Sequence, residues 1–227
     1  MSTTDLEIVP PSEPVDEFRD GIVAALTVRL GSALVGSHVR PNDDLWVRVA
    51  ADAWADTFRL LRDVHGLRYF NFLSAIDWMP SPYGRDMDSQ VDNVLEGKEP
   101  KAPDARTTGV AGGDTRFQVF ARVHNLADHW GITVKADVPD DSLTMDSIIS
   151  VYAGANWHER EVAEMYGVSF AGHPDLRKLY LPTEFEGYPL RKDFALLARR
   201  IRPWPGIVDV EQMPGDNEPD EAAAEPA

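Results

Sequence analysis

The 227-residue sequence contains no cysteine. Disulfides, thiolate zinc sites, thiol nucleophiles and cysteine-ligated iron–sulfur clusters are therefore excluded for this chain. Any redox cofactor that works with it must belong to a neighbour.

The sequence also lacks an apolar run of about eighteen residues, the length needed by a membrane-spanning helix. No secretory leader is recognisable at the acidic, proline-rich N-terminus. We therefore expect the chain to stay in the cytoplasm or another reducing compartment, and to reach a membrane only through partners.

Positive charge is scarce, and the net charge is −16. Residues 206–227 hold seven acidic residues and no basic one, and residues 1–20 hold six acidic residues and Arg19. Charge concentrated at the ends indicates solvated, self-repelling tails, and it argues against nucleic acid binding. We predict that residues 1–15 and 206–227 are disordered.

Periodicity predicts the order of helices and strands along the chain. Apolar residues at helical spacing predict helices over 16–30 and from an N-cap at Asp52 to Gly66. Alternating or aromatic-rich runs predict strands over 32–39, 45–50, 68–76, 117–123 and 132–138. Residues 142–155 read as a short helix, and Asn156 is placed as the cap of a last helix that ends at Gly167.

These elements predict an α+β fold: a mostly antiparallel sheet with helices on one side. The predicted core domain covers residues 16–167. Residues 79–115 have turn clusters and few large apolar groups, so we interpret them as an insertion loop. Residues 168–205 are predicted to be an extended segment that wraps a partner, called the strap below, and residues 206–227 form the acidic tail.

The last predicted helix carries carboxylates that need partners. On a helical wheel Trp157, Val162, Met165 and Tyr166 form one apolar arc, with Glu161 inside it and Glu164 at its edge. A carboxylate is too costly to bury unpaired. Basic residues outnumber acidic ones between residues 177 and 202, so we predict that Arg177 or Arg191 meets Glu161 or Glu164.

A catalytic interpretation of the same helix is weak. His158-Glu159 begins an H-E-x-x-H zinc motif, but Val162 stands where the second histidine is required. His173 lies beyond a glycine turn, and no third ligand has suitable spacing. The sequence also lacks G-x-S-x-G and phosphate-loop motifs. A stand-alone metal-dependent hydrolase using His158, Glu159 and His173 remains a remote alternative.

The strap has the composition of a protein interface. Its prolines prevent a long helix, while aromatic and leucine side chains recur too often for a solvated loop. Arginines stand between these apolar residues, as they do at interfaces that bury aromatic and arginine side chains. We therefore predict binding to a large partner.

One stretch carries a family resemblance. The pattern Glu159-Arg160-Glu161-x-x-Glu164-Met165-Tyr166, followed by His173-x-x-x-Arg177-x-Leu179 and by FEGYPLRKDF over 185–194, resembles the C subunit of NADH-quinone oxidoreductase, the 30 kDa core subunit of respiratory complex I. The resemblance implies interface or structural roles for a set of residues in this stretch. They are Glu159, Arg160, Glu161, Glu164, His173, Asp175, Arg177, Phe185, Arg191, Lys192 and Asp193.

The resemblance further implies a subunit of the peripheral arm of a proton-translocating enzyme that passes electrons from NADH to quinone. FMN, iron–sulfur clusters and quinone would be carried by other subunits, and this chain would hold no cofactor, metal or catalytic residue. Its chief partner would be the 49 kDa-type D subunit, with the B and I subunits nearby, on the cytoplasmic face of the inner or plasma membrane. The alternative is the equivalent subunit of a related membrane-bound hydrogenase or dehydrogenase. Tyr188, Ala195 and the long insertion depart from the family pattern.

Overall fold

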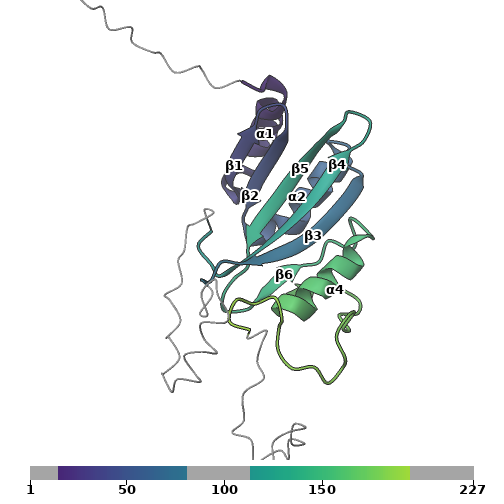
Figure 1. The fold of residues 1–227 in the computed structure, drawn as a ribbon. Helices are drawn as coiled ribbons and strands as arrows, with labels where there is room; N and C mark the ends of the chain where they lie inside the picture. The colour runs from purple at the N-terminus through teal and green to yellow at the C-terminus, as the bar shows by residue number, and fades with distance from the viewer. Residues whose placement is uncertain (1–14, 81–112, 195–227) are drawn as a thin grey trace, which may run out of the picture. The chain divides into compact units, whose positions relative to one another are not determined.

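The computed structural model describes residues 15–80 and 113–194 (Figure 1). Most of the predicted insertion, the predicted tails apart from Val15, and residues 195–205 of the strap therefore lie outside the described residues. The helices are α1 (Glu17–Leu30), α2 (Trp54–Asp63) and α4 (Ala155–Tyr166). The strands are β1 (Leu34–Arg40), β2 (Asp44–Val49), β3 (Tyr69–Asp77), β4 (Phe117–Asn125), β5 (Trp130–Asp137), β6 (Thr144–Asp146) and β7 (Ser169–Ala171).

The five longer strands form one sheet in the order β1-β2-β5-β4-β3 (Figure 1). The β1–β2, β4–β5 and β3–β4 pairs are antiparallel, which confirms the predicted α+β fold with a mostly antiparallel sheet. The β2–β5 pair is parallel and was not predicted. Its two strands are separated in the sequence by α2, β3 and β4, so no turn signal between them reports how they pair.

One face of this sheet carries the core. Val47, Val134, Ala121 and Leu73 follow one another across four strands in register, and all four are buried. The alternation expected for strands with one solvated face places the larger polar side chains on the opposite face.

The helices supply the other half of the core. Leu26 of α1, Phe58 of α2 and Val162 of α4 are buried. Tyr152, which precedes α4, packs its ring against Phe58 at 6.1 Å between centroids and against Phe70 of β3 at 5.7 Å. Because large aromatic side chains bury much apolar area, these contacts join α2 to the sheet through Tyr152.

The helix predicted over residues 142–155 is wrong. The chain instead forms β6, which pairs in parallel with β7, and then a series of turns. Met145 and Phe170 are register partners and both are buried. Over Thr144–Asp146 the polarity alternates with period two, and this strand pattern prevails over the helical spacing of the apolar residues downstream.

Two predicted helix caps are also wrong. Asp52 lies in a 3-10 turn (Ala51–Ala53), and α2 begins after Ala53 without a side-chain cap. Asn156 is inside α4, which follows Gly154. The predicted glycine ends of α1 and α4 are confirmed, because Gly31 and Gly167 cap them with positive φ. The predicted end of α2 at Gly66 is wrong, because α2 ends at Asp63 with Val64 as its C-cap. No helix within the described ranges is long and apolar enough to cross a membrane.

Candidate interface: the strap and the contacts that hold it

The described part of the strap, residues 168–194, begins with β7 and then has no regular element from Gly172 to Phe194. Backbone N–H and C=O groups in such a segment need partners outside a helix or sheet ladder. In this chain, side chains and carbonyls of α4 supply many of them.

Glu164 of α4 binds three consecutive backbone N–H groups of the strap. Its carboxylate accepts hydrogen bonds from Leu179 at 2.7 Å, from Tyr180 at 3.0 Å and from Leu181. Burial alone would raise the pKa of Glu164, but the three backbone donors outweigh it and hold that pKa below its ordinary value. The carboxylate therefore stays charged and fixes the direction of the chain at this point.

Arg160 lies one turn before Glu164 and donates hydrogen bonds to backbone carbonyls of the strap. Its Nε donates to the carbonyl of Arg177 at 3.0 Å, and its Nη2 donates to the carbonyl of Lys178 at 3.2 Å. Residues four apart share one face of a helix. Arg160 and Glu164 thus hold adjacent acceptors and donors of one segment, and both side chains are buried.

His173 and Asp175 shape the start of the strap. His173 contacts the carbonyl of Asn156 through Nε2 at 3.2 Å, and its Nδ1 accepts the N–H of Asp175 at 3.0 Å. Asp175 in turn accepts the N–H of Arg177 and forms an exposed ion pair with its guanidinium. Arg177 therefore faces solvent, and the predicted contact of Arg177 with Glu161 or Glu164 is wrong.

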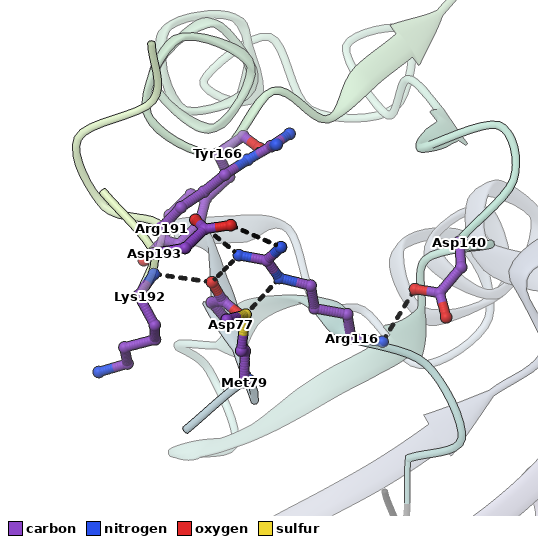
Figure 2. A network of polar contacts seen from close by, with 8 residues as sticks. All are labelled: Asp77, Met79, Arg116, Asp140, Tyr166, Arg191, Lys192 and Asp193. Carbon is purple, nitrogen blue, oxygen red and sulfur yellow. Dashed lines mark hydrogen bonds and ion pairs between the residues drawn. The ribbon is translucent and has the colours of Figure 1, made fainter. Parts of the chain in front are cut away.

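The far end of the strap is fixed by Asp77, Arg116 and Asp193, which we call the latch (Figure 2). Asp77 ends β3 and is buried, while Arg116 directly precedes β4. The Arg116 guanidinium donates to both Asp77 oxygens, at 3.0 and 2.7 Å, and also to both Asp193 oxygens, at 3.1 and 2.9 Å. The planar guanidinium of Arg116 thus joins the end of β3 and the start of β4 to the strap.

Backbone donors complete the latch. Lys192 N–H donates to Asp77 at 2.8 Å, and Met79 N–H donates to its other oxygen at 3.0 Å (Figure 2). Burial would raise the pKa of Asp77, but the hydrogen bonds from Arg116 and from these two backbone groups lower it overall. The hydrogen bonds that Arg116 donates to Asp77 raise the pKa of Arg116. Both groups are therefore charged across the neutral pH range.

Arg191 binds the end of α4 rather than a glutamate, so its predicted contact is also wrong. Its Nε donates to the carbonyl of Tyr166 at 2.6 Å, and its guanidinium lies 4.2 Å from the Tyr188 ring centroid. A cation at a helix C-terminus satisfies the last carbonyls and suits the helix dipole. A Cβ on Gly167 would lie 2.5 Å from Arg191 Nη2, so glycine is needed there for this approach as well as for its positive φ.

Glu159 is the fully buried carboxylate of α4, and it does not bind the strap. It accepts hydrogen bonds from the Ser147 hydroxyl at 2.5 Å and from Ile148 N–H at 2.7 Å. Burial raises the pKa of Glu159 to about 7, against the lowering effect of these two donors. The carboxylate fixes the turns that follow β6 to the helix.

The predicted apolar arc of α4 is correct at Val162 but wrong at Trp157. Trp157 is 67% exposed, whereas the buried face of α4 runs through Ala155, Glu159 and Val162. Glu161 is half-buried, and none of the described basic side chains makes an ion pair with it.

The residues proposed for a metal-dependent hydrolase do not converge. His158 Nδ1 contacts the carbonyl of Leu73 at 3.2 Å, His173 contacts Asn156, and Glu159 binds Ser147. Within residues 15–80 and 113–194, no group of three His, Asp or Glu side chains could hold a metal ion.

Several large apolar side chains of the strap are exposed to solvent. Tyr180 is 62% exposed, Leu190 48% and Tyr188 40%. Phe185 is half-buried and lies 6.1 Å from Phe194 between ring centroids. The strap is therefore held by its backbone and by a few inward side chains, while large apolar groups project from it.

Sequence reasoning missed Asp77, Arg116 and Ser147. The signal for Asp77 was available, because it has the same alternation as the buried Leu73 and Ala75 and so faces the core. A carboxylate in that position requires a cation or several donors. Nothing local marks Arg116 or Ser147, whose roles depend on contacts across 39 and 12 residues of sequence.

The latch is expected to contribute strongly to stability. Asp77→Asn removes the buried charge that pairs with Arg116 and should lower the free energy of unfolding by roughly 3 kcal/mol, measured by urea denaturation. Asp193→Asn is the matched control, because the Asp193 side chain is 42% exposed and its loss should have a smaller effect. Equal losses for both variants would contradict the buried pairing.

The strap attachment can be tested by proteolysis. Glu164→Gln replaces an acceptor oxygen with an amide donor that faces backbone N–H groups, so the segment should detach more often. We expect trypsin to cleave after Arg177 and Lys178 about tenfold faster, in line with the loss of one or two hydrogen bonds. Glu161→Gln, on the same helix, should leave the rate unchanged. Unaltered cleavage of the Glu164 variant would contradict this attachment.

Glu159 predicts a pH dependence with a definite sign. Its pKa is about 7 in the folded chain against an ordinary 4.5, so ionisation favours unfolding. Relative to Glu159→Gln, the wild-type chain should lose stability as pH rises from about 5 to 7, by up to about 3 kcal/mol, and change little above that range. Thermal unfolding across pH would show this, and parallel curves for the two proteins would contradict it.

Comparison with known proteins agrees with this architecture. Residues 47–200 match the family model described as respiratory-chain NADH dehydrogenase, 30 Kd subunit. The C 2 subunit of NADH-quinone oxidoreductase from Rhizobium etli is 44% identical over 81 residues, 36% of this chain and 43% of that protein. The C subunit of NADH-quinone oxidoreductase from Roseiflexus castenholzii is 31% identical over 182 residues, 79% of this chain and 86% of that protein.

A solved structure of the membrane-bound sulfane sulfur reductase, an archaeal respiratory membrane complex, contains a chain with the same fold. Its TM-score is 0.56 with 20% sequence identity, covering 87% of this chain and 97% of that one. The family match covers more than half of the sequence and includes α4, the latch and the described strap. The chain belongs to the family of the 30 kDa subunit of respiratory-chain NADH dehydrogenase.

Proposed function

We propose that this chain is a cofactor-free core subunit in the peripheral arm of a proton-translocating NADH-quinone oxidoreductase. Its activity would be that of the assembled enzyme, and its own task would be to present the strap to neighbouring subunits. The observation that carries this proposal is the pre-shaped strap. Glu164, Arg160 and the latch fix its backbone, while Tyr180, Tyr188 and Leu190 project outward.

Eight of the eleven family-pattern residues fall into two groups that suit this task. Arg160, Glu164, His173, Arg191 and Asp193 bind other parts of the same chain. The side chains of Asp175, Arg177 and Lys192 are exposed, and we propose that they contact partners together with the projecting aromatic residues. Exposed aromatic side chains beside arginine have the composition of interface hot spots.

We infer that the principal partner is the 49 kDa-type D subunit, with the B and I subunits nearby, at the cytoplasmic face of the membrane. FMN, the iron–sulfur clusters and the quinone site would lie in other subunits. The cysteine-free sequence supports this division, because it offers no thiolate ligand for a cluster. Attachment to the membrane would pass through these partners.

A related membrane complex is the second candidate. The same fold occurs in the archaeal sulfane sulfur reductase complex, which favours the view that this architecture serves several respiratory machines. The hydrolase alternative gains no comparable support from the separated positions of His158, Glu159 and His173.

Affinity purification of the tagged full chain from membranes of its own organism tests the assignment. We expect it to copurify with the subunits of an NADH-quinone oxidoreductase, and the complex to oxidise NADH with quinone while the isolated chain does not. Asp77→Asn should reduce the copurified subunits several-fold, because a loosened strap docks less well. Recovery with a nickel-ligating large subunit, or NADH-quinone turnover by the isolated chain, would overturn the assignment.

A further inference from the structure

One side of α4 serves neither the core nor the strap. Glu159 and Val162 face the core, and Glu164 binds the strap. Trp157 and Glu161 lie four residues apart in the helix, a spacing that makes side chains neighbours on its surface. Trp157 is 67% exposed, and Glu161 is half-buried. This pair of side chains is therefore open to contact from another molecule.

Glu161 has no cation of its own among the described residues. Arg160, its neighbour in α4, donates to strap carbonyls. In the strap, Arg177 pairs with an aspartate, and the Lys178 Nζ donates to three backbone carbonyls. Arg191 binds the C-terminal end of α4. Glu161 also lies at the middle of the helix, where the helix dipole gives it little compensation. A half-buried carboxylate in this position favours a cation from outside the chain.

The ring of Trp157 narrows the choice of cation. An indole face attracts cationic side chains, and arginine is found there more often than lysine. A planar guanidinium can stack on the ring and pair with a carboxylate one helical turn away. There is also room for the chain that carries it, because Trp157 borders a hollow of about 470 Å³. The hollow is lined by Ala153, Gly154, Asn156, Trp157 and His158.

We propose that Trp157 and Glu161 bind an arginine of a neighbouring subunit, whose guanidinium stacks on the indole and pairs with the carboxylate. This site adjoins the strap, because His173 contacts the carbonyl of Asn156, the residue before Trp157. One partner can therefore cover both. A second copy of this chain is disfavoured, since two chains of net charge −16 repel each other. The inference rests on the proposed function, because it needs an assembled complex.

Competition for assembly tests this site. Wild-type and Glu161→Gln full chains with different tags are produced together in the chain's own organism, and mass spectrometry measures their shares in the purified complex. We expect about tenfold less of the variant, the effect of losing one strong interface contact. Trp157→Ala should have a similar effect, and the double variant should lose less than the product of the two, because both side chains hold one guanidinium. Asp20→Asn, which removes an exposed carboxylate of α1, should compete equally.

A cross-link identifies the partner. A photo-cross-linking amino acid in place of Ala153 puts the probe at the hollow, and it should join an arginine-containing peptide of another oxidoreductase subunit. Glu161→Arg should assemble poorly with the wild-type partner, because two cations then face each other. Replacing the partner's arginine with glutamate should restore assembly. A chain that merely misfolded would not be rescued in this way.

Each other result counts against the arginine site. Equal incorporation of Glu161→Gln and wild type would overturn it, as would independent effects of the two substitutions or a charge reversal without rescue. Cross-links to this chain's own residues 1–14, 81–112 or 195–227, or to a second copy distinguished by isotope labelling, would also overturn it. Recovery of a complex without oxidoreductase subunits would contradict the proposed function. An oxidoreductase complex that assembles equally well with every variant would contradict the arginine site alone.

Discussion

The part of the strap from Gly172 to Phe194 depends on α4 for many of its backbone hydrogen bonds. A chain without a helix or sheet ladder must satisfy its polar groups elsewhere, and unpaired ones are costly where water is excluded. Glu164 takes three strap N–H groups and Arg160 gives to two strap carbonyls. The position of the strap around residues 177–181 therefore follows from the orientation of one helix, which the core fixes through Val162 and the buried Glu159.

Three buried carboxylates among the described residues show three ways to hold an acid away from water. Asp77 is paired with a guanidinium, Glu164 receives backbone donors, and Glu159 has two neutral donors and a raised pKa. The first two stay charged and orient the strap, while the third is the one whose protonation lies near neutral pH. Asp77 and Glu164 thus attach the strap, whereas Glu159 attaches the turns after β6.

The sequence predicted the parts of the fold that depend on local pattern. The α+β class, the β4–β5 hairpin and the glycine that ends α4 follow from alternation and turn chemistry. The parallel β2–β5 and β6–β7 pairs could not be predicted in this way, because they join segments that are distant in the sequence. The resemblance marked Glu164 and Arg191, but a helical wheel could not show that their partners are backbone groups. A helical wheel places only side chains on a helix, so it gives no information about contacts to backbone groups of another segment.

We infer that the strap is already shaped before it meets a partner. Hydrogen–deuterium exchange of the Leu179, Tyr180 and Leu181 amides in the isolated full-length chain tests this most directly. We expect slowed exchange at these three positions, because their N–H groups are bound to Glu164. Exchange at the rate of an unstructured peptide would contradict it, and would mean that the strap takes its shape only on the assembled complex.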